Sequence, residues 1–170
     1  KVLVLGGGTA GLAAATIAHG MRADVTVVDI NQNRLAQIDQ IFAGTVTTLV
    51  SNLHEIEEQA LQADMIIGAV LVHGAKAPRL ITNEIVKKMK PGSVLVDIAI
   101  DQGGCFEDSR PTTHAEPTFT VHDSIFYCVA NMPGAVPFTS TYALSNATLR
   151  YALSLADRGW KEALRLDPAL

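Results

Sequence analysis

The feature that most restricts the fold is the segment GGGTAG at residues 6–11, which directly follows an apolar run at residues 1–5. The small-residue stretch 9–19 comes next and is typical of a helix. In a strand–turn–helix unit with this spacing, Gly6 permits the tight turn, Gly8 lets backbone approach a pyrophosphate, and Gly11 lets the helix pack closely on the sheet. The helix N-terminus, from Thr9 and Ala10 onward, offers N–H groups to the phosphates. The segment therefore predicts a dinucleotide site.

A carboxylate, Asp29, ends the next apolar segment at residues 24–29. At this distance from the glycines it would accept hydrogen bonds from both hydroxyls of the adenosine ribose and repel a 2′-phosphate, which favours NAD over NADP. Arg34 lies nearby and weakens that preference. Two alternatives stay open. The glycines could form an ordinary turn with Asp29 capping the following helix, or the nucleotide could be a flavin, although flavoproteins usually need longer chains.

Strand-like and helix-like segments alternate along the chain, which predicts an α/β fold: a three-layer, doubly wound parallel sheet, or Rossmann fold. Gly20 is expected to end the first helix in the left-handed conformation. The expected strands are residues 1–5, 24–29, 45–50, 65–72, 93–98, 118–121 and 125–129, and the expected helices are residues 9–19, 32–42, 53–62 and 83–89.

The second half of the chain is less regular. Residues 102–117 form a long segment rich in Gly, Asp, Thr and Pro, and loops of that length are usually functional or disordered. Residues 131–137 are a Pro/Gly turn, and 140–166 are mostly helical with a break near Gly159. We expect residues 1–138 to form the nucleotide-binding domain and residues 139–170 a long C-terminal helical segment that packs on it.

Composition narrows the class of protein. The chain is 48% hydrophobic and 18% charged, which indicates a folded domain. A net charge of −4 gives no reason to expect nucleic acid or an anionic membrane as a partner. No apolar run is long enough to cross a membrane, and no signal peptide opens the chain.

The cysteines indicate a cellular compartment, and the first residue indicates that the chain is part of a longer protein. Cys105 and Cys128 are not in a CxxC pair, so we expect no metal site, and two free thiols suit the reducing cytoplasm. Lys1 already lies inside the first expected strand, so we expect the chain to be an excised domain.

A second acidic residue, Asp101, follows the strand expected at residues 93–98. Ligands of open α/β sheets bind beyond the carboxyl ends of the strands, so Asp101 is expected beside a nicotinamide ring, where a carboxylate can exchange protons with a substrate amine or hydroxyl. Gly103 and Gly104 would let backbone approach a planar ligand. Spacing alone allows equally that Asp101 merely caps its own loop.

Several longer blocks resemble the alanine dehydrogenase family, and the resemblance runs over essentially the whole chain. The blocks are residues 65–71, 74–78, 89–93, 96–104, 129–137, 139–144 and 167–170. The NAD-binding component of proton-translocating transhydrogenase shares much of this architecture, but the segment Ile100-Asp101-Gln102 favours the dehydrogenase. The resemblance implies reversible oxidative deamination of L-alanine to pyruvate and ammonia, with reduction of NAD.

The resemblance also implies roles for single residues. Asp101 matches a catalytic aspartate that takes part in proton transfer, and Asp29 matches the acid that binds the ribose. Arg34 stands where the family usually has a lysine that contacts the cofactor, and His73 stands where proline is common. The remaining implied cofactor contacts are Ser51 at the adenine end, Val70, Leu71 and Ile98 along the cofactor, and Asn131 and Met132 at the nicotinamide.

The family's substrate-binding arginine and lysine and its catalytic histidine lie in an amino-terminal domain that this sequence does not include. We therefore expect the chain alone to bind NAD and to turn over alanine very poorly. None of its histidines (His19, His54, His73, His114 and His122) is expected to replace the missing one. Lys76 either reaches the ligand or fixes its own loop.

An apolar stripe runs along the predicted C-terminal helix. Its members recur at helical spacing: Leu144, Leu149, Leu153, Ala156, Trp160, Ala163 and Leu164. An exposed stripe of this kind favours association, so we expect a homo-oligomer, and the full-length family implies a hexamer. A Rossmann module that senses nucleotide without chemistry remains an alternative to the enzyme.

Overall fold

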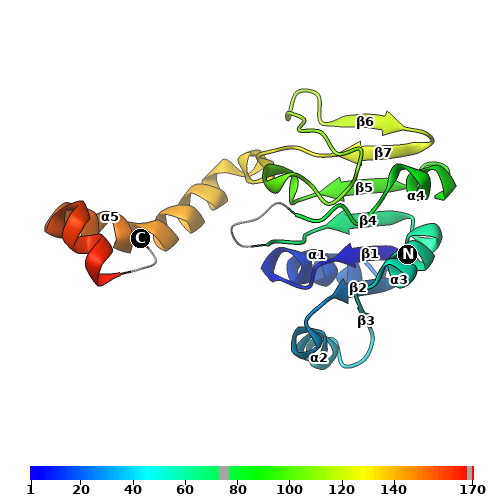
Figure 1. Ribbon diagram of the computed structural model, residues 1–170, viewed down its shortest axis with the longest axis horizontal. Helices are drawn as coiled ribbons and strands as arrows, with labels where there is room; N and C mark the ends of the chain where they lie inside the picture. Colours follow the sequence, from blue (N-terminus) through cyan, green and yellow to red (C-terminus); the bar gives the residue numbers. More distant parts are fainter. Residues whose placement is uncertain (73–76, 168–169) are drawn as a thin grey trace. The chain divides into compact units, whose positions relative to one another are not determined.

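The computed structural model describes residues 1–72, 77–167 and 170, and its first part is a seven-stranded sheet (Figure 1). The strand order is β3-β2-β1-β4-β5-β7-β6. All neighbouring strands are parallel except β6, which pairs antiparallel with β7 at one edge. The predicted Rossmann fold is confirmed. The strands are β1 (Val2–Leu5), β2 (Val25–Asp29), β3 (Thr47–Val50), β4 (Met65–Gly68), β5 (Val94–Asp97), β6 (Thr118–Val121) and β7 (Ser124–Tyr127).

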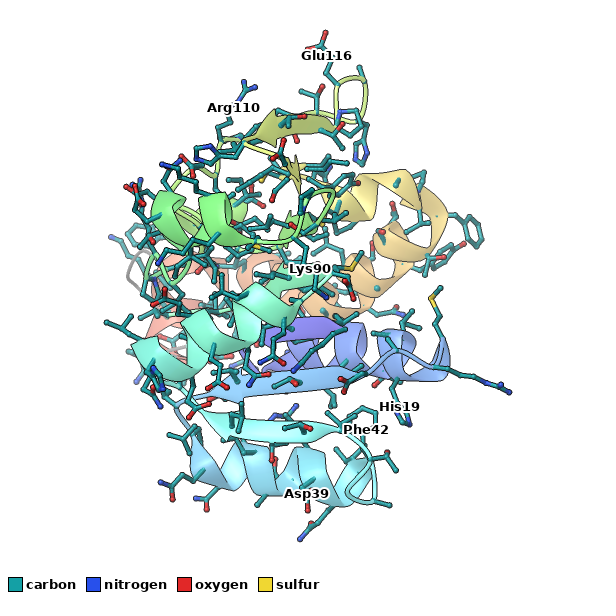
Figure 2. The ribbon with its side chains drawn as sticks, turned by 90° about the vertical axis from the view of Figure 1, so that its right-hand side faces the viewer. His19, Asp39, Phe42, Lys90, Arg110 and Glu116 are labelled. Carbon is teal, nitrogen blue, oxygen red and sulfur yellow. The ribbon has the colours of Figure 1, made fainter. Side chains whose placement is uncertain are left out.

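Successive strand residues point to opposite faces of the sheet. Both faces carry apolar side chains here, and helices cover both of them. Leu3 and Leu5 of β1 join a core with Ile56 and Ile85, while Val4 joins a separate core on the other face. The first core lies under α3 (Leu53–Gln62) and α4 (Asn83–Lys88), and the second lies under α1 (Thr9–Gly20) and α2 (Gln32–Ile41). Figure 2 labels His19 at the end of α1 beside Phe42 at the end of α2, and their ring centroids are 5.3 Å apart.

The end of α1 differs from the prediction. Gly20 is the last helical residue, and the left-handed residue is Arg22, at φ 64°. Arg22 N–H donates to the His19 carbonyl and Ala23 N–H donates to the Ala18 carbonyl, which is a Schellman motif. The hydrogen-bond pattern sets the left-handed position two residues beyond Gly20, so composition alone misplaced it.

Strand β4 is shorter than predicted, ending at Gly68 rather than residue 72. Gly68 lies opposite Leu5 and Asp97, the last residues of the two neighbouring strands, so no ladder partner is available beyond it. The other elements agree with the prediction to within about two residues at each end, except that the C-terminal helix begins at Pro137, three residues before the predicted start.

The long segment after β5 contains one short 3₁₀ helix, η1 (Ile100–Gln102), and forms two isolated bridges to residues outside the strands. Phe106 bridges to Ile81, and Thr112 bridges to Val129. This segment returns the chain to the edge pair β6 and β7.

The chain divides into two compact units, Lys1–Ala130 and Asn131–Leu170. The second unit consists of η2 (Met132–Ala135) and α5 (Pro137–Leu166). Gly159 has non-helical angles (φ 73°, ψ 156°), which confirms the predicted break. Large apolar side chains of α5, including Trp160 at 63% exposure, are uncovered within this unit. Its packing on the first unit and its association with other copies stay predictions.

The described residues contain neither a candidate membrane span nor a candidate metal site. None of the helices in that part of the chain is both long enough and apolar enough to cross a membrane. Among the same residues, no group of three or more His, Cys, Asp or Glu side chains is arranged to hold a metal ion.

Candidate functional site

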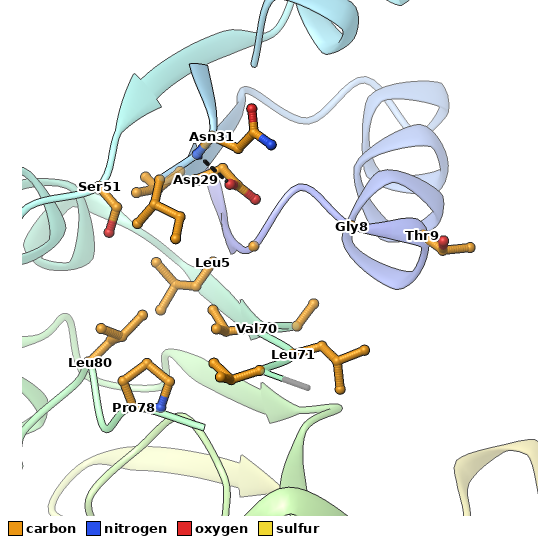
Figure 3. Close-up of a pocket in the computed structure, with 15 residues that line it drawn as sticks. Leu5, Gly8, Thr9, Asp29, Asn31, Ser51, Val70, Leu71, Pro78 and Leu80 are labelled. Atoms are coloured by element: carbon orange, nitrogen blue, oxygen red, sulfur yellow. Dashed lines mark hydrogen bonds between the residues drawn. The ribbon is translucent and has the colours of Figure 1, made fainter. Parts of the chain in front are cut away.

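A cavity lies where the strand order changes direction, between the carboxyl ends of β1 and β4, which is where open α/β sheets bind ligands. It encloses about 550 Å³ and is mainly apolar. Asp29 and Ser51 lie on one side of it, and Pro78 and Leu80 lie across from them (Figure 3). The lining residues are Leu5, Gly6, Gly8, Thr9, Val28, Asp29, Ile30, Asn31, Ser51, Ala69, Val70, Leu71, Val72, Pro78 and Leu80.

Three glycines of the turn have three different reasons to lack a side chain. Gly6 has φ +96°, and a Cβ there would come 2.8 Å from the Ala69 carbonyl oxygen. A Cβ on Gly11 would lie 1.8 Å from the Gly6 carbonyl oxygen. A Cβ on Gly8 would meet no protein atom within 4 Å, so Gly8 leaves open space at the cavity, while Gly6 and Gly11 make the turn possible.

The start of α1 differs from the starts of the other helices that line the sheet. Side chains of Asn31, Asn52 and Thr82 accept a hydrogen bond from the first turns of α2, α3 and α4. The residue before α1 is Gly8, and no side chain in the described part of the chain caps that helix. The first-turn N–H groups of α1 and its positive dipole end are therefore available to an anion.

Asp29 and Arg34 both hold the glycine turn. One carboxylate oxygen of Asp29 accepts from Gly7 N–H at 2.6 Å, and the other accepts from Asn31 N–H at 2.8 Å. Arg34 Nε donates to the Gly7 carbonyl at 2.5 Å, and its guanidinium also donates to Gln37. Asp29 lines the cavity and Arg34 lies beside the turn, so the two predicted cofactor residues have different surroundings.

A second, smaller cavity of about 190 Å³ adjoins the first, since both are lined by Ala69, Val70 and Leu71. Asp101 and Gln102 of η1 line it, together with Ala10 of α1 and Ile98. Asp101 is exposed at the tip of its loop. The structure thus brings the glycine turn and the Asp101 loop to the two ends of one depression in the edge of the sheet.

Most sequence-predicted residues of the first unit meet at these two cavities. Ser51, Val70, Leu71 and Ile98 line one or both. The Thr9 side chain points away from the cavity, so its contribution there is backbone (Figure 3). Asn131 and Met132 begin the second unit and are described only with it. His73 and Lys76 lie outside the described residues.

Sequence reasoning missed Asp97, the last residue of β5. Its side chain is completely buried, and its carboxylate accepts from Ala99 N–H at 3.1 Å, from Cys105 N–H at 2.9 Å and from the Ser109 hydroxyl. Burial raises the pKa of Asp97, and these hydrogen bonds act against that rise. The signal was present in the sequence, because a charged residue at the end of a central parallel strand is unusual.

Both cysteines are free and buried near this carboxylate. Burial and the nearby charge of Asp97 raise the pKa of the Cys105 thiol to about 12, and burial raises the pKa of Cys128. At neutral pH both side chains are thiols, which are poor nucleophiles and poor metal ligands.

Comparison with known proteins agrees with this geometry. Residues 1–170 match the family described as alanine dehydrogenase/PNT, C-terminal domain. The chain belongs to this family. It is 64% identical to an alanine dehydrogenase of Mycolicibacterium smegmatis over 170 residues, which is all of the chain and 46% of that relative. The chain therefore spans about half the length of the curated relatives it matches.

Solved structures give the same family placement. A structure titled L-alanine dehydrogenase matches all of the chain and 47% of its own, with a TM-score of 0.91 at 49% identity. A transhydrogenase from Sinorhizobium meliloti matches 84% of the chain and 40% of its own, with a TM-score of 0.74 at 27% identity. The dehydrogenase side of the family is the nearer of these two.

Proposed function

We propose that this chain is the NAD-binding domain of an alanine dehydrogenase, which converts L-alanine reversibly to pyruvate and ammonia. The observation that carries the proposal is the pair of adjoining cavities between the glycine turn and the Asp101 loop, in a chain that matches the family over its whole length. Bound NAD would supply the hydride acceptor. The residues of this chain would bind and orient the cofactor, and Asp101 would transfer a proton.

The residues around the larger cavity fit the adenosine and pyrophosphate of NAD. Gly8 leaves room for phosphate beside the uncapped first turn of α1, whose N–H groups and dipole favour negative charge. Asp29 is held by Gly7 and Asn31 with part of its carboxylate at the cavity, where it would accept hydrogen bonds from the ribose hydroxyls. Its negative charge would repel a 2′-phosphate, so NAD is preferred over NADP.

Arg34 has a supporting role in this proposal. Its bond to the Gly7 carbonyl holds the turn from the α2 side. At the other end of the site, Asp101 would exchange the proton of the substrate amine or hydroxyl, because it lines the smaller cavity from an exposed position. Asn131 and Met132 would contact the nicotinamide amide and ribose, as the family resemblance implies.

The chemical step needs substrate and cofactor held together. We propose that the substrate-binding residues come from a further domain, that the complete enzyme is a homo-oligomer, a hexamer by family resemblance, and that the 170-residue chain alone has negligible alanine turnover. The similarity to the transhydrogenase structure supports a second candidate, an NAD(H)-binding component of such an enzyme.

Calorimetric titration of the chain with NAD and NADP tests the cofactor. We expect saturable NAD binding and much weaker NADP binding, and Asp29→Arg should abolish the NAD preference. Asp39→Asn is the matched control, since Asp39 is an exposed carboxylate on the outer face of α2 (Figure 2). No NAD binding, or equal binding by Asp29→Arg, would refute the cofactor assignment.

Alanine-dependent NADH formation by the complete protein tests the reaction. Asp101→Asn removes the ionisable group and should lower kcat by about 10²–10⁴-fold, the range of general acid–base catalysis. Asp39→Asn should leave kcat unchanged. Unchanged activity of Asp101→Asn would remove Asp101 from the mechanism, and the absence of alanine oxidation by the unmodified protein would favour the transhydrogenase candidate.

A further inference from the structure

The buried carboxylate of Asp97 has no part in the proposed chemistry, yet it occupies the base of the loop that carries Asp101. Its side chain is fully buried at the end of β5, and no Lys or Arg in the described part of the chain forms an ion pair with it. Burying a carboxylate without a cation is unfavourable unless its oxygens accept hydrogen bonds. The placement of those hydrogen bonds therefore indicates what the residue does.

The hydrogen bonds of Asp97 join three points of one loop. Oδ1 accepts from Ala99 N–H, immediately before η1, and Oδ2 accepts from Cys105 N–H, shortly after it. The Ser109 hydroxyl donates to the same Oδ2 from farther along the chain. The carboxylate thus holds together the two ends of the segment that contains Asp101.

Backbone geometry within the loop complements this anchor. Gly103 and Gly104 both have positive φ, and the N–H groups of Gln102 and Gly104 donate to the Ala99 carbonyl. A Cβ on Gly104 would lie 2.7 Å from Oδ2 of Asp97. Gly104 therefore leaves the space that the carboxylate fills, and the loop closes tightly around it.

The anchored loop is also packed against β4. A Cβ on Gly68 would come 2.9 Å from the Cys105 Cβ and 3.0 Å from the Phe106 ring, so the loop lies directly on that strand. Ala77 N–H donates to the Gln102 carbonyl from the other side. With its base fixed in this way, η1 has Asp101 exposed at the smaller cavity.

We propose that Asp97 is a positioning residue, which fixes the loop 98–109 so that Asp101 stands at the reacting end of the cofactor site. The inference rests on the proposed role of Asp101. Small displacements of a catalytic group are costly to rate, so loss of the anchor should act on the chemical step. It should leave binding at the glycine turn intact, because Gly6–Gly11 has its own contacts to Ala69 and Asp29.

The test uses Asp97→Asn in the complete protein, because the amide keeps the shape but replaces one acceptor oxygen with a donor. We expect kcat to fall by roughly tenfold to a hundredfold, with the Kd for NADH changed by less than about threefold. Hydrogen exchange of the amides at residues 99–105 should become faster, while exchange in β1 and β2 stays unchanged.

Ser93→Ala is the matched control, since Ser93 and Ser124 form a buried hydroxyl pair of 2.8 Å at the other end of β5. It removes a buried hydrogen bond from the residue just before the same strand and should leave kcat and loop exchange unaffected. Equal effects of Asp97→Asn and Ser93→Ala would overturn the proposal, as would unchanged kcat or unchanged exchange at 99–105 in Asp97→Asn.

Ser109 provides a second pair of variants should Asp97→Asn fail to fold. Ser109→Ala removes one donor to the carboxylate and should lower kcat, while Ser109→Thr should restore it. No loss in Ser109→Ala, or no recovery in Ser109→Thr, would overturn the proposal. Failure of the proposed function is distinguishable, because the unmodified protein would then lack alanine oxidation while the exchange measurements still report on the anchor.

Discussion

The two ends of the candidate site are built in different ways. The glycine turn is specified by near neighbours and by absent side chains: Gly6 leaves room for the Ala69 carbonyl, Gly11 for the Gly6 carbonyl, and Gly8 for a ligand. The Asp101 loop is specified by a present side chain, since Asp97 holds Cys105 and Ser109 from across the loop. A motif search can find the first kind of site, whereas the second kind becomes visible only when the buried polar groups are traced to their partners.

The strongest challenge to this contrast is Gly11→Ala. Its methyl group would stand 1.8 Å from the Gly6 carbonyl oxygen, so the turn or α1 must move. We expect a loss of about 3 kcal/mol or more in the free energy of unfolding, together with loss of NAD binding. Urea unfolding measures the stability and calorimetry measures the NAD binding. A variant as stable as the wild type would contradict the predicted steric clash.

Gly104→Ala applies the same change to the other end of the site. The added methyl meets Asp97 Oδ2, and φ +78° is unfavourable for alanine, so we expect a stability loss of about 1–3 kcal/mol. Unlike Gly11→Ala, it should leave NAD affinity nearly unchanged while alanine oxidation in the complete protein falls. Parallel loss of NAD affinity would mean that the two ends are one cooperative structure.

Gly8→Ala separates folding from binding within the turn itself. The residue has φ −63°, which alanine adopts readily, and no protein atom lies near the added Cβ. We expect stability to change by less than about 1 kcal/mol and NAD affinity to fall by about tenfold or more, equivalent to about 1.4 kcal/mol. Thermal unfolding with and without NAD reports both effects. Unchanged affinity would place the phosphates elsewhere.

The pH dependence of stability tests how the loop anchor is maintained. Burial raises the folded-state pKa of Asp97 above its value of about 3.9 in an unfolded chain. The stabilisation linked to this group is full below the unfolded value and is lost as pH rises through the folded pKa. The unfolding free energy of the wild type minus that of Asp97→Asn should therefore decrease as the pH rises above about 4, while the difference for Ser93→Ala stays constant.

The smallest expected effect separates the cost of a left-handed backbone from the cost of a steric clash. Arg22 and Ala43 have positive φ at the ends of α1 and α2 without being glycine, so those positions tolerate a side chain that Gly6 could not. Replacement of either by glycine should stabilise the chain by roughly 0.5 kcal/mol, measured by urea unfolding. Arg22→Ala is the control, since it keeps the left-handed strain. Destabilisation by glycine would contradict this account.

Much of the fold followed from local patterns. The glycine spacing and Asp29 predicted the nucleotide turn, and apolar runs with turns between them predicted the parallel sheet. Predictions failed where distant partners decide the outcome: β4 ends at Gly68 because its neighbours end there, and Arg22 is left-handed because of two hydrogen bonds. The anchor at Asp97 was missed for the same reason, since its partners Cys105 and Ser109 lie 8 and 12 residues away along the chain.

The break at Gly159 bears on how the second unit could be covered by other protein surfaces. Angles of φ 73° and ψ 156° are open essentially to glycine alone, so one residue turns the helix axis between Phe138 and Trp160. The exposed apolar side chains before and after the break therefore belong to two helical segments rather than one. An assembly that buries the apolar side chains of one segment leaves those of the other exposed to water. Solubility should therefore improve in two steps, as each segment is buried in turn.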